Sequence, residues 1–125
     1  MIFLNTEEVI MLHGRLIART GGLDGLRDRG LLESALQGAF ASFDGVERYP
    51  SLEEKAARYA YALTSSHAFI DGNKRIGAFV MLVTLSLNNV ELAYTQDELV
   101  TLGLSLADGS SGYEETLAWI LHHKK

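Results

Sequence analysis

Apolar residues recur along the chain at intervals of three and four residues, the spacing that places them on one face of a helix. This spacing marks five amphipathic helices, within residues 6–20, 31–43, 51–67, 95–106 and 111–121. A sixth stretch, from Ile76 to Asn88, is apolar on nearly every side, which is typical of a helix at the centre of a bundle. We therefore expect an all-α fold, a compact bundle of about six helices around this central apolar helix.

Polar residues mark where these helices begin. Thr6 is expected to cap the first helix, because two glutamates follow it in the opening turn. Three capping boxes are predicted from a serine or threonine followed three residues later by glutamate: Ser51 with Glu54, Thr95 with Glu98, and Ser111 with Glu114. Residues 43–50 predict a loop or short hairpin, and residues 90–93 a short extended piece. No repeat or linker divides the chain, so residues 1–125 form one predicted domain.

The composition is that of an ordinary globular protein and limits the expected partners. Apolar residues make up 47% of the 125 residues, and 16 acidic against 11 basic side chains leave a net charge of -5. Such a surface is not drawn to phosphate backbones or anionic lipid, so no direct nucleic-acid or membrane partner is expected. The chain holds no cysteine, which excludes disulfides and thiol catalysis. No signal sequence is visible at Met1–Asn5, so the cytoplasm is the expected compartment.

The residues between the third helix and the central helix carry the candidate chemistry. One short stretch holds a histidine, a carboxylate, a glycine, an amide and two cations: His67, Asp71, Gly72, Asn73, Lys74 and Arg75. A glycine-containing turn that enters a helix directs free N–H groups and the positive end of the helix dipole to one point, which suits a phosphate. Lys74 and Arg75 add positive charge, whereas Asp71 beside a phosphate suits Mg²⁺ bound between the two. His67 can accept the proton of an attacking hydroxyl.

Each of these residues also has an ordinary structural explanation. Asp71 or Asn73 could cap the central helix, the two cations could be solvated, and His67 could be a satisfied histidine at a helix end. Taken one at a time, these explanations are the commoner ones. The combination in one short stretch favours instead a site that transfers part of a nucleotide to a hydroxyl group.

The stretch His67-Ala-Phe69-Ile-Asp71-Gly72-Asn73-Lys74-Arg75 resembles the signature of the Fic/Doc (Fido) family, and specifically of its Doc branch. Residues 21–35, which include Gly21-Gly22-Leu23, resemble the N-terminal part of Doc-like chains as well. The resemblance implies a compact helical fold, a nucleotide held over the motif, and a protein hydroxyl as acceptor. It implies His67 as catalytic base, Asp71 as the Mg²⁺ ligand and Phe69 as a buried anchor. The residues that it implies around the phosphates are Gly72, Asn73, Lys74 and Arg75.

Three positions depart from the Fic adenylyltransferase pattern His-Pro-Phe-x-Asp-Gly-Asn-Gly-Arg-x-x-Arg. Ala68 replaces the proline, Lys74 the last glycine and Ala78 the second arginine. A lysine side chain at position 74 occupies space that glycine would leave to a diphosphate, so we expect the nucleotide to bind in the reverse sense. In Doc, which shares the Lys-Arg ending, the implied reaction is transfer of the γ-phosphoryl group of ATP to a threonine of elongation factor Tu, which halts translation.

The resemblance also implies partners. A Doc-like toxin belongs to a toxin-antitoxin pair, and its antitoxin, of the Phd type, has a flexible C-terminal segment that folds into a groove beside the site. Residues 43–50 would correspond to the family's flap, which pairs with an extended target segment. Two other functions stay open here, a Fic-type adenylyltransferase and a non-catalytic regulatory binding domain. The remaining histidines, His13, His122 and His123, are expected on helix surfaces or in the tail.

Overall fold

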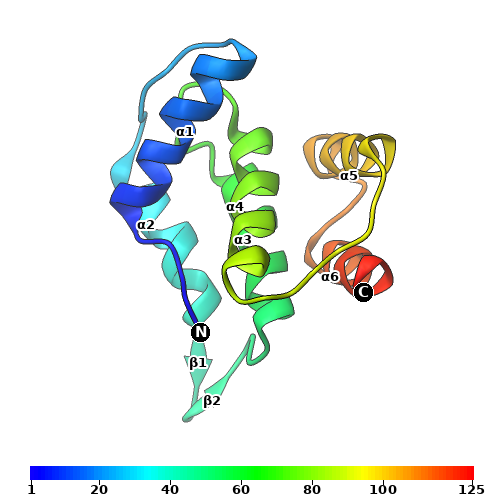
Figure 1. Ribbon diagram of the computed structural model, residues 1–125. Coiled ribbons are helices and arrows are strands. Elements are labelled where there is room, and N and C mark those ends of the chain that lie inside the picture. Colours follow the sequence, from blue (N-terminus) through cyan, green and yellow to red (C-terminus); the bar gives the residue numbers. More distant parts are fainter.

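The computed structural model describes residues 1–125 and contains six α-helices, a 3-10 turn and a hairpin (Figure 1). The helices are α1 (Thr6–Thr20), α2 (Arg29–Gln37), α3 (Leu52–Ser66), α4 (Asn73–Leu87), α5 (Gln96–Asp108) and α6 (Tyr113–His123). The 3-10 turn η1 (Gly38–Phe40) extends α2. Strands β1 (Ser42–Phe43) and β2 (Val46–Glu47) pair in antiparallel fashion. The predicted all-α fold of about six helices is confirmed.

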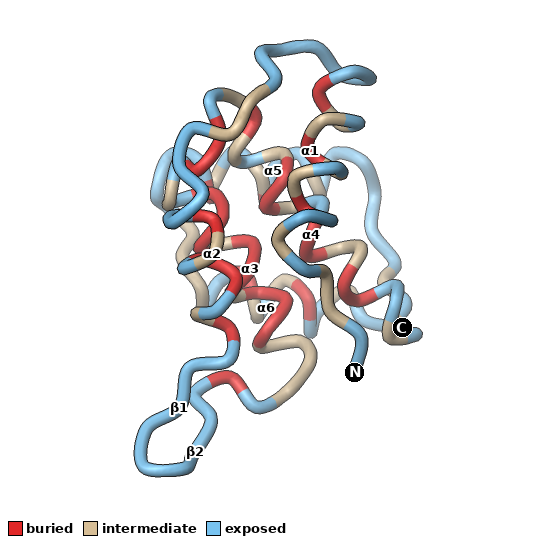
Figure 2. Tube along the Cα trace, turned by 90° about the vertical axis from the view of Figure 1, so that its left-hand side faces the viewer, coloured by how far each residue is buried: buried red, intermediate tan, exposed pale blue.

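The helices α3 and α4 lie side by side in the middle of the molecule, with α1 and α2 on one side and α5 and α6 on the other (Figure 1). One core cluster joins α1 and α2 to this central pair, and a second joins α5 and α6 to it. Buried positions accordingly follow the inward sides of the helices, while the hairpin is exposed throughout (Figure 2). The predicted central helix is therefore one member of a pair, and α4 leaves Phe79 and Leu87 exposed by 36% and 40%.

The two central helices approach most closely at Gly77. A Cβ atom at this position would lie 2.7 Å from Oγ1 of Thr64 and 2.8 Å from the carbonyl oxygen of Ala60. Both neighbours belong to α3, and a backbone oxygen cannot rotate away. The residue at this crossing must therefore be glycine if the spacing between α3 and α4 is to be kept.

The helix starts test the predicted caps. The Ser51–Glu54 and Thr95–Glu98 capping boxes are confirmed, each with both reciprocal hydrogen bonds. The prediction that Thr6 caps α1 was wrong by one residue, because Asn5 is the cap and accepts from the backbone N–H of Glu8. Asn5 with Glu8 satisfies the same spacing rule, so the local pattern did not distinguish the two positions.

The predicted capping box at Ser111 is also wrong. The backbone N–H of Ser111 donates to the carbonyl of Ser105 at 3.0 Å, which closes the end of α5. The helix α6 starts after Gly112 instead, whose N–H donates to the carboxylate of Glu115. The way the chain leaves α5 therefore decides where α6 begins.

The predicted hairpin is confirmed, and it projects from the end at which α3 begins (Figure 1). Lys55 is only 3% exposed and fixes its base, because its ammonium donates to Glu47 at 2.9 Å and to the carbonyl of Tyr49. His67 follows the opposite end of α3, roughly 22 Å away at about 1.5 Å per helical residue. The hairpin agrees with the short flap expected of the fold, and it lies at the end of α3 opposite His67; its pairing with a target segment stays a prediction.

The chain end pairs with the predicted extended piece. The N–H of Ala93 donates to the carbonyl of His123 at 2.7 Å, and the N–H of Lys125 to that of Glu91 at 3.0 Å. The imidazole of His123 is also engaged, by Glu98 at 2.6 Å and by the carbonyl of Trp119 at 2.7 Å, which ties the last residue of α6 to the start of α5. None of the helices combines the length and apolar character needed to cross a bilayer.

Candidate active site

His67 follows the last residue of α3 and turns the chain away from that helix. Its backbone lies in the left-handed region, at φ 52° and ψ 41°. A non-glycine residue there is strained by about 1–2 kcal/mol, and such strain is often kept where a side chain must be aimed. The side chain is exposed and neither ring nitrogen bonds to a protein group, in contrast to His13 and His123. Both ring nitrogens are therefore available to a bound ligand or substrate.

His67 lines a recess of about 560 Å³, which we call the motif recess. Its walls are the last turn of α3, the motif loop (residues 67–72), the first turn of α4 and, on the other side, Leu106–Gly109 at the end of α5. The contribution of α5 was not predicted, because nothing in the local pattern of residues 106–109 refers to the motif. Tertiary packing brings the two segments together.

The start of α4 offers backbone donors to this recess. Gly72 precedes the helix at φ 75° and ψ 21°, a left-handed conformation that glycine adopts without strain, and no side chain caps the helix. The first backbone bond back to this end runs from Ile76 N–H to the carbonyl of Gly72 at 2.9 Å. The N–H groups of Asn73, Lys74 and Arg75 precede that bond and have no intrahelical acceptor. The helix dipole adds positive potential at the same point, so an anion is favoured there.

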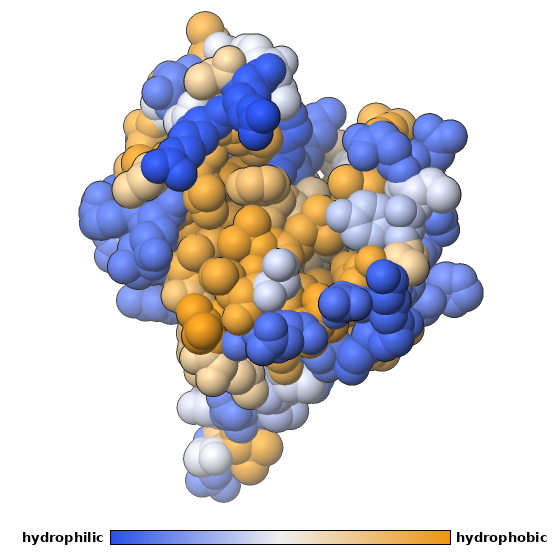
Figure 3. Space-filling view, in the orientation of Figure 1, coloured by the Kyte–Doolittle hydropathy of each residue, from blue (hydrophilic) through white to orange (hydrophobic).

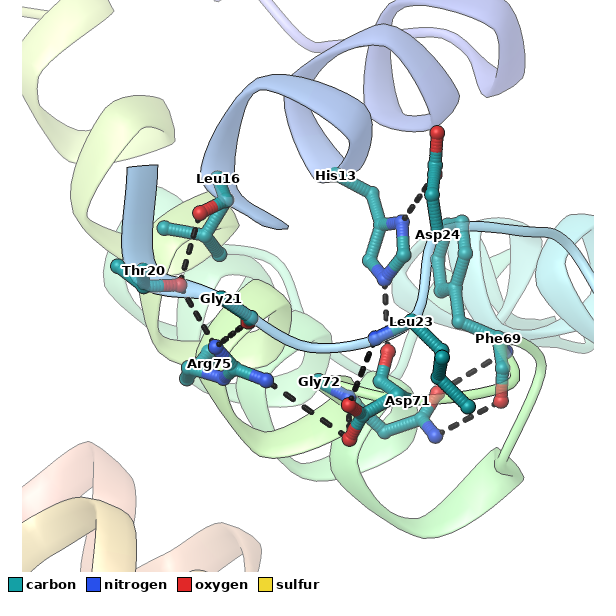
Figure 4. Close-up of polar contacts among 11 residues, drawn as sticks. His13, Leu16, Thr20, Gly21, Leu23, Asp24, Phe69, Asp71, Gly72 and Arg75 are labelled. Carbon is teal, nitrogen blue, oxygen red and sulfur yellow. Dashed lines mark hydrogen bonds and ion pairs between the residues drawn. The ribbon is translucent and has the colours of Figure 1, made fainter. Parts of the chain in front are cut away.

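The carboxylate of Asp71 is held by two backbone groups. One oxygen accepts from Leu23 N–H at 3.0 Å and the other from Gly72 N–H at 2.8 Å (Figure 4). These bonds, with that from Leu23 the stronger influence, hold the pKa of Asp71 below its usual value, and the nearby Arg75 guanidinium acts in the same sense. The side chain is 43% exposed, so an ionised carboxylate faces the recess. Such a group suits Mg²⁺, which proteins bind by one or two carboxylates together with substrate phosphates.

The amide of Asn73 closes the motif loop on itself. Its oxygen accepts from Phe69 N–H and its nitrogen donates to the Phe69 carbonyl, both at 3.0 Å. Phe69 is 2% exposed and belongs to the core cluster, so this pair of bonds ties the loop to the core. The structural role predicted for the Asn73 side chain is a helix cap, but in the structure this side chain holds the motif loop together instead, as a loop clamp. Its backbone N–H is the group that remains for a ligand.

The two cations of the motif differ in their surroundings. Arg75 donates to Thr20 Oγ1 at 2.6 Å and to the carbonyl of Gly21 at 2.7 Å, so it joins the end of α1 to the start of α4. Its other terminal nitrogen lies 3.7 Å from Asp71. Lys74 is exposed on the wall of the recess and forms no ion pair. The lysines that do pair with carboxylates are Lys55, Lys124 and Lys125. Lys74 is the cation most available to a bound anion.

A second chain segment, residues 21–28, runs against the motif loop and was not predicted to border the site. Leu26 forms an antiparallel bridge with Phe69. The hydrogen bonds of this pairing are Ile70 N–H to Gly25 O at 3.0 Å, Arg27 N–H and Asp28 N–H to Ala68 O at 2.8 and 3.0 Å, and Arg27 Nε to His67 O at 2.8 Å. The glycines of this segment could have indicated the contact, since a close approach of two backbones favours glycine.

Gly22 shows why a glycine is needed in this segment. Its φ is +118°, and a Cβ atom there would lie 2.5 Å from Oδ2 of Asp71 and 3.0 Å from Nη2 of Arg75. Only glycine lets the following N–H of Leu23 reach the carboxylate. The segment and the motif therefore form one unit, although 48 residues separate Leu23 from Asp71.

The comparisons with known proteins identify the family of this chain. The model of the Fic/DOC family matches residues 3–85, which include α1, the segment of residues 21–28 and the whole motif. A relative named Toxin Doc, from Mycolicibacterium smegmatis, is 41% identical over 91 residues, covering 73% of this chain and 68% of the relative. A relative named Protein kinase doc, from Escherichia phage P1, is 35% identical over 109 residues, covering 87% and 85%. The chain therefore belongs to the Fic/Doc family.

Proposed function

We propose that the chain is a Doc-like toxin that transfers the γ-phosphoryl group of ATP to a serine or threonine hydroxyl of a protein. The observation that carries the proposal is the exposed, unbonded imidazole of His67 on the same recess as the uncapped start of α4. A base and an anion site on one recess suit transfer of a phosphoryl group to a hydroxyl. The kinase name of the phage P1 relative supports the same reaction class.

Each residue of the recess has a role in this proposal. His67 takes the proton of the acceptor hydroxyl as its oxygen forms a bond to the γ-phosphorus, and the bond from that phosphorus to the bridging oxygen of ADP breaks. Phosphate oxygens are held by the backbone N–H groups of Asn73, Lys74 and Arg75. The left-handed conformation of Gly72 lets the chain turn into α4 just before these groups. Lys74 adds a mobile positive charge. Asp71 would hold Mg²⁺, which when bound neutralises phosphate charge.

The alternative reaction is transfer of AMP, as in Fic adenylyltransferases. Two features favour phosphoryl transfer. Lys74 stands on the wall of the recess where those enzymes have glycine, and Ala78 cannot supply the second arginine of their pattern. With no arginine at position 78, the triphosphate has one cation fewer to hold it in the adenylyltransferase sense.

We further propose that an antitoxin of the Phd type occupies a groove beside the recess, which we call the apolar groove. It has a volume of about 620 Å³ and lies between α1, α4 and α5, where Figure 3 shows a hollowed hydrophobic surface. Its lining includes Phe79, Leu82, Leu99 and Leu104, and Lys74 and Arg75 line both the groove and the recess. An amphipathic helix could place its apolar face here and an acidic side chain against Lys74.

The reaction is tested with elongation factor Tu, the expected target, and ATP labelled separately at the α and γ positions. We expect label from the γ position only, dependent on Mg²⁺ and lost in His67→Ala. His122→Ala is the matched control, because His122 is also exposed but lies on α6, away from the recess. Label from the α position would establish the adenylyltransferase instead. Growth inhibition that persists in His67→Ala would favour a non-catalytic binding domain.

The antitoxin surface is tested with a pair of matched substitutions. Leu104→Asp changes a 59% exposed leucine on the apolar groove, and Leu121→Asp changes a 53% exposed leucine on α6 that does not line it. We expect only Leu104→Asp to weaken binding of a Phd-type C-terminal peptide. Action on a translation factor, together with this partner, would place the protein in the cytoplasm.

A further inference from the structure

The buried histidine of α1 contacts the motif loop without lining the recess. His13 is 1% exposed, so the prediction that it lies on the helix surface was wrong. It shares one stripe of α1 with Val9 and Ile17, which are also buried and lie four residues on either side. The spacing of these three residues was therefore available as a signal. A histidine on an apolar stripe needs a polar partner inside the protein.

The partner of His13 is the motif itself. Its Nε2 lies 2.7 Å from the carbonyl oxygen of Asp71, and its ring stacks on Phe69 with a centroid separation of 3.8 Å and an angle of 13° (Figure 4). A carbonyl can only accept, so Nε2 carries the hydrogen and donates it. The other nitrogen, Nδ1, lies 3.6 Å from the largely exposed carboxylate of Asp24, which is too far for a hydrogen bond.

This hydrogen bond sets the direction of one peptide group. In a trans peptide the C=O and N–H point to opposite sides. With the Asp71 carbonyl drawn toward His13, the N–H of Gly72 turns the other way and donates to the Asp71 carboxylate. The other oxygen of the same carboxylate accepts a hydrogen bond from Leu23 N–H. The orientation of the carboxylate and of the first N–H groups of α4 thus follows from the direction of the Asp71–Gly72 peptide.

We propose that His13 is a positioning residue for the transfer reaction, which it serves by fixing the Asp71–Gly72 peptide with its Nε2–H. This inference rests on the proposed function only where the transfer activity is measured. The effect of His13 on the loop can be measured without substrate. His13 does not touch the reacting groups. It acts through Asp71, whose carboxylate faces the recess, and through the donors that follow Gly72.

A pair of substitutions separates this role from simple filling of the core. His13→Phe keeps a ring to stack on Phe69 but has no donor, whereas His13→Gln keeps an N–H donor but has no ring. If His13 only fills space, the phenylalanine variant should behave like the wild type and the glutamine variant should be impaired. If His13 positions the peptide, the order is reversed. Asp24→Asn is the control, because it changes the neighbour of Nδ1 and leaves the Nε2 bond in place.

The variants are compared by thermal unfolding, by NMR measurement of amide exchange at Leu23 and Gly72, and by phosphoryl transfer to elongation factor Tu. We expect His13→Phe to speed exchange of the Leu23 amide about tenfold and to lower kcat/KM at least as much, the scale of one lost buried hydrogen bond. His13→Gln should recover most of both losses, and Asp24→Asn should match the wild type.

Slow exchange retained in His13→Phe, or a glutamine variant no better than the phenylalanine variant, would overturn the proposal. If His13→Phe fails to fold, His13→Gln alone decides, because slow Leu23 exchange in that variant supports positioning and fast exchange refutes it. A wild-type protein that transfers no phosphoryl group would refute the proposed reaction, while the exchange measurements would still test the role of His13.

Discussion

The crossing of α3 and α4 at Gly77 allows a stability prediction whose sign is set by the structure. In Gly77→Ala, the new Cβ would lie 2.7 Å from Thr64 Oγ1, 2.8 Å from Ala60 O and 3.3 Å from Thr64 N. Two of these three neighbours are backbone atoms, so the helices themselves must move. We place the cost of this overpacking near the upper end of the usual range, at about 3 kcal/mol.

An opposing contribution must be subtracted from this cost. Alanine is favoured over glycine inside a helix by roughly 1 kcal/mol, so the net loss of unfolding free energy is about 2 kcal/mol. The unfolding entropy is about 2.1 cal/mol/K per residue, or roughly 0.26 kcal/mol/K for this chain, so Tm should fall by about 8 °C. Phosphoryl transfer should fall too, because Thr64 precedes His67 at the end of α3 and Gly77 belongs to the motif helix.

Gly103 provides the matched control in the same protein. It lies within α5, and a Cβ atom there would meet nothing within 4 Å. Gly103→Ala should therefore gain only the helix preference, about 0.5–1 kcal/mol, and raise Tm by roughly 2–4 °C. Both variants are followed by circular dichroism on heating, with a urea titration to check that the m-value is unchanged. A rise in Tm for Gly77→Ala similar to that for Gly103→Ala would refute the close crossing.

Three further predictions concern the motif and the chain end. Asn73→Ala removes both hydrogen bonds to Phe69 and should lower stability by about 1–3 kcal/mol, measured by urea unfolding; an unchanged midpoint would argue against the loop clamp. Lys74→Ala should weaken binding of an ATP analogue in calorimetry without changing Tm, and equal affinity would exclude Lys74 as a phosphate ligand. The His123–Glu98 pair raises the pKa of His123 from 6.5 and lowers that of Glu98 to about 2, each chiefly through their mutual hydrogen bond. The contribution of protonated His123 to the free energy of unfolding is complete below about pH 6.5 and is lost as the pH rises above that value. The contribution of ionised Glu98 is complete above about pH 4.5 and is lost as the pH falls toward 2. The Tm difference between the wild type and Glu98→Gln should therefore be largest between these two values and shrink at higher pH, whereas a constant difference would contradict the ion pair.

Features that depend on neighbouring residues could be read from the sequence. The boxes at Ser51 and Thr95 need only a partner three residues away, and both formed as predicted. The helices followed from apolar spacing, and the family followed from the contiguous motif of residues 67–75. Errors of one residue, as at Thr6, arose where two adjacent positions satisfied the same local rule.

Contacts between distant segments could not be read in this way, because they depend on how the helices pack. The Leu23 bond to Asp71 spans 48 residues and that of His13 spans 58. No local rule specifies which turn of α1 or which end of α5 comes to lie beside a loop formed much later in the chain. The sequence by itself thus determined the helices, the motif and the family. Only the tertiary structure decided that Asp71 is held from two sides, that Asn73 clamps the loop and that the end of α5 completes the recess.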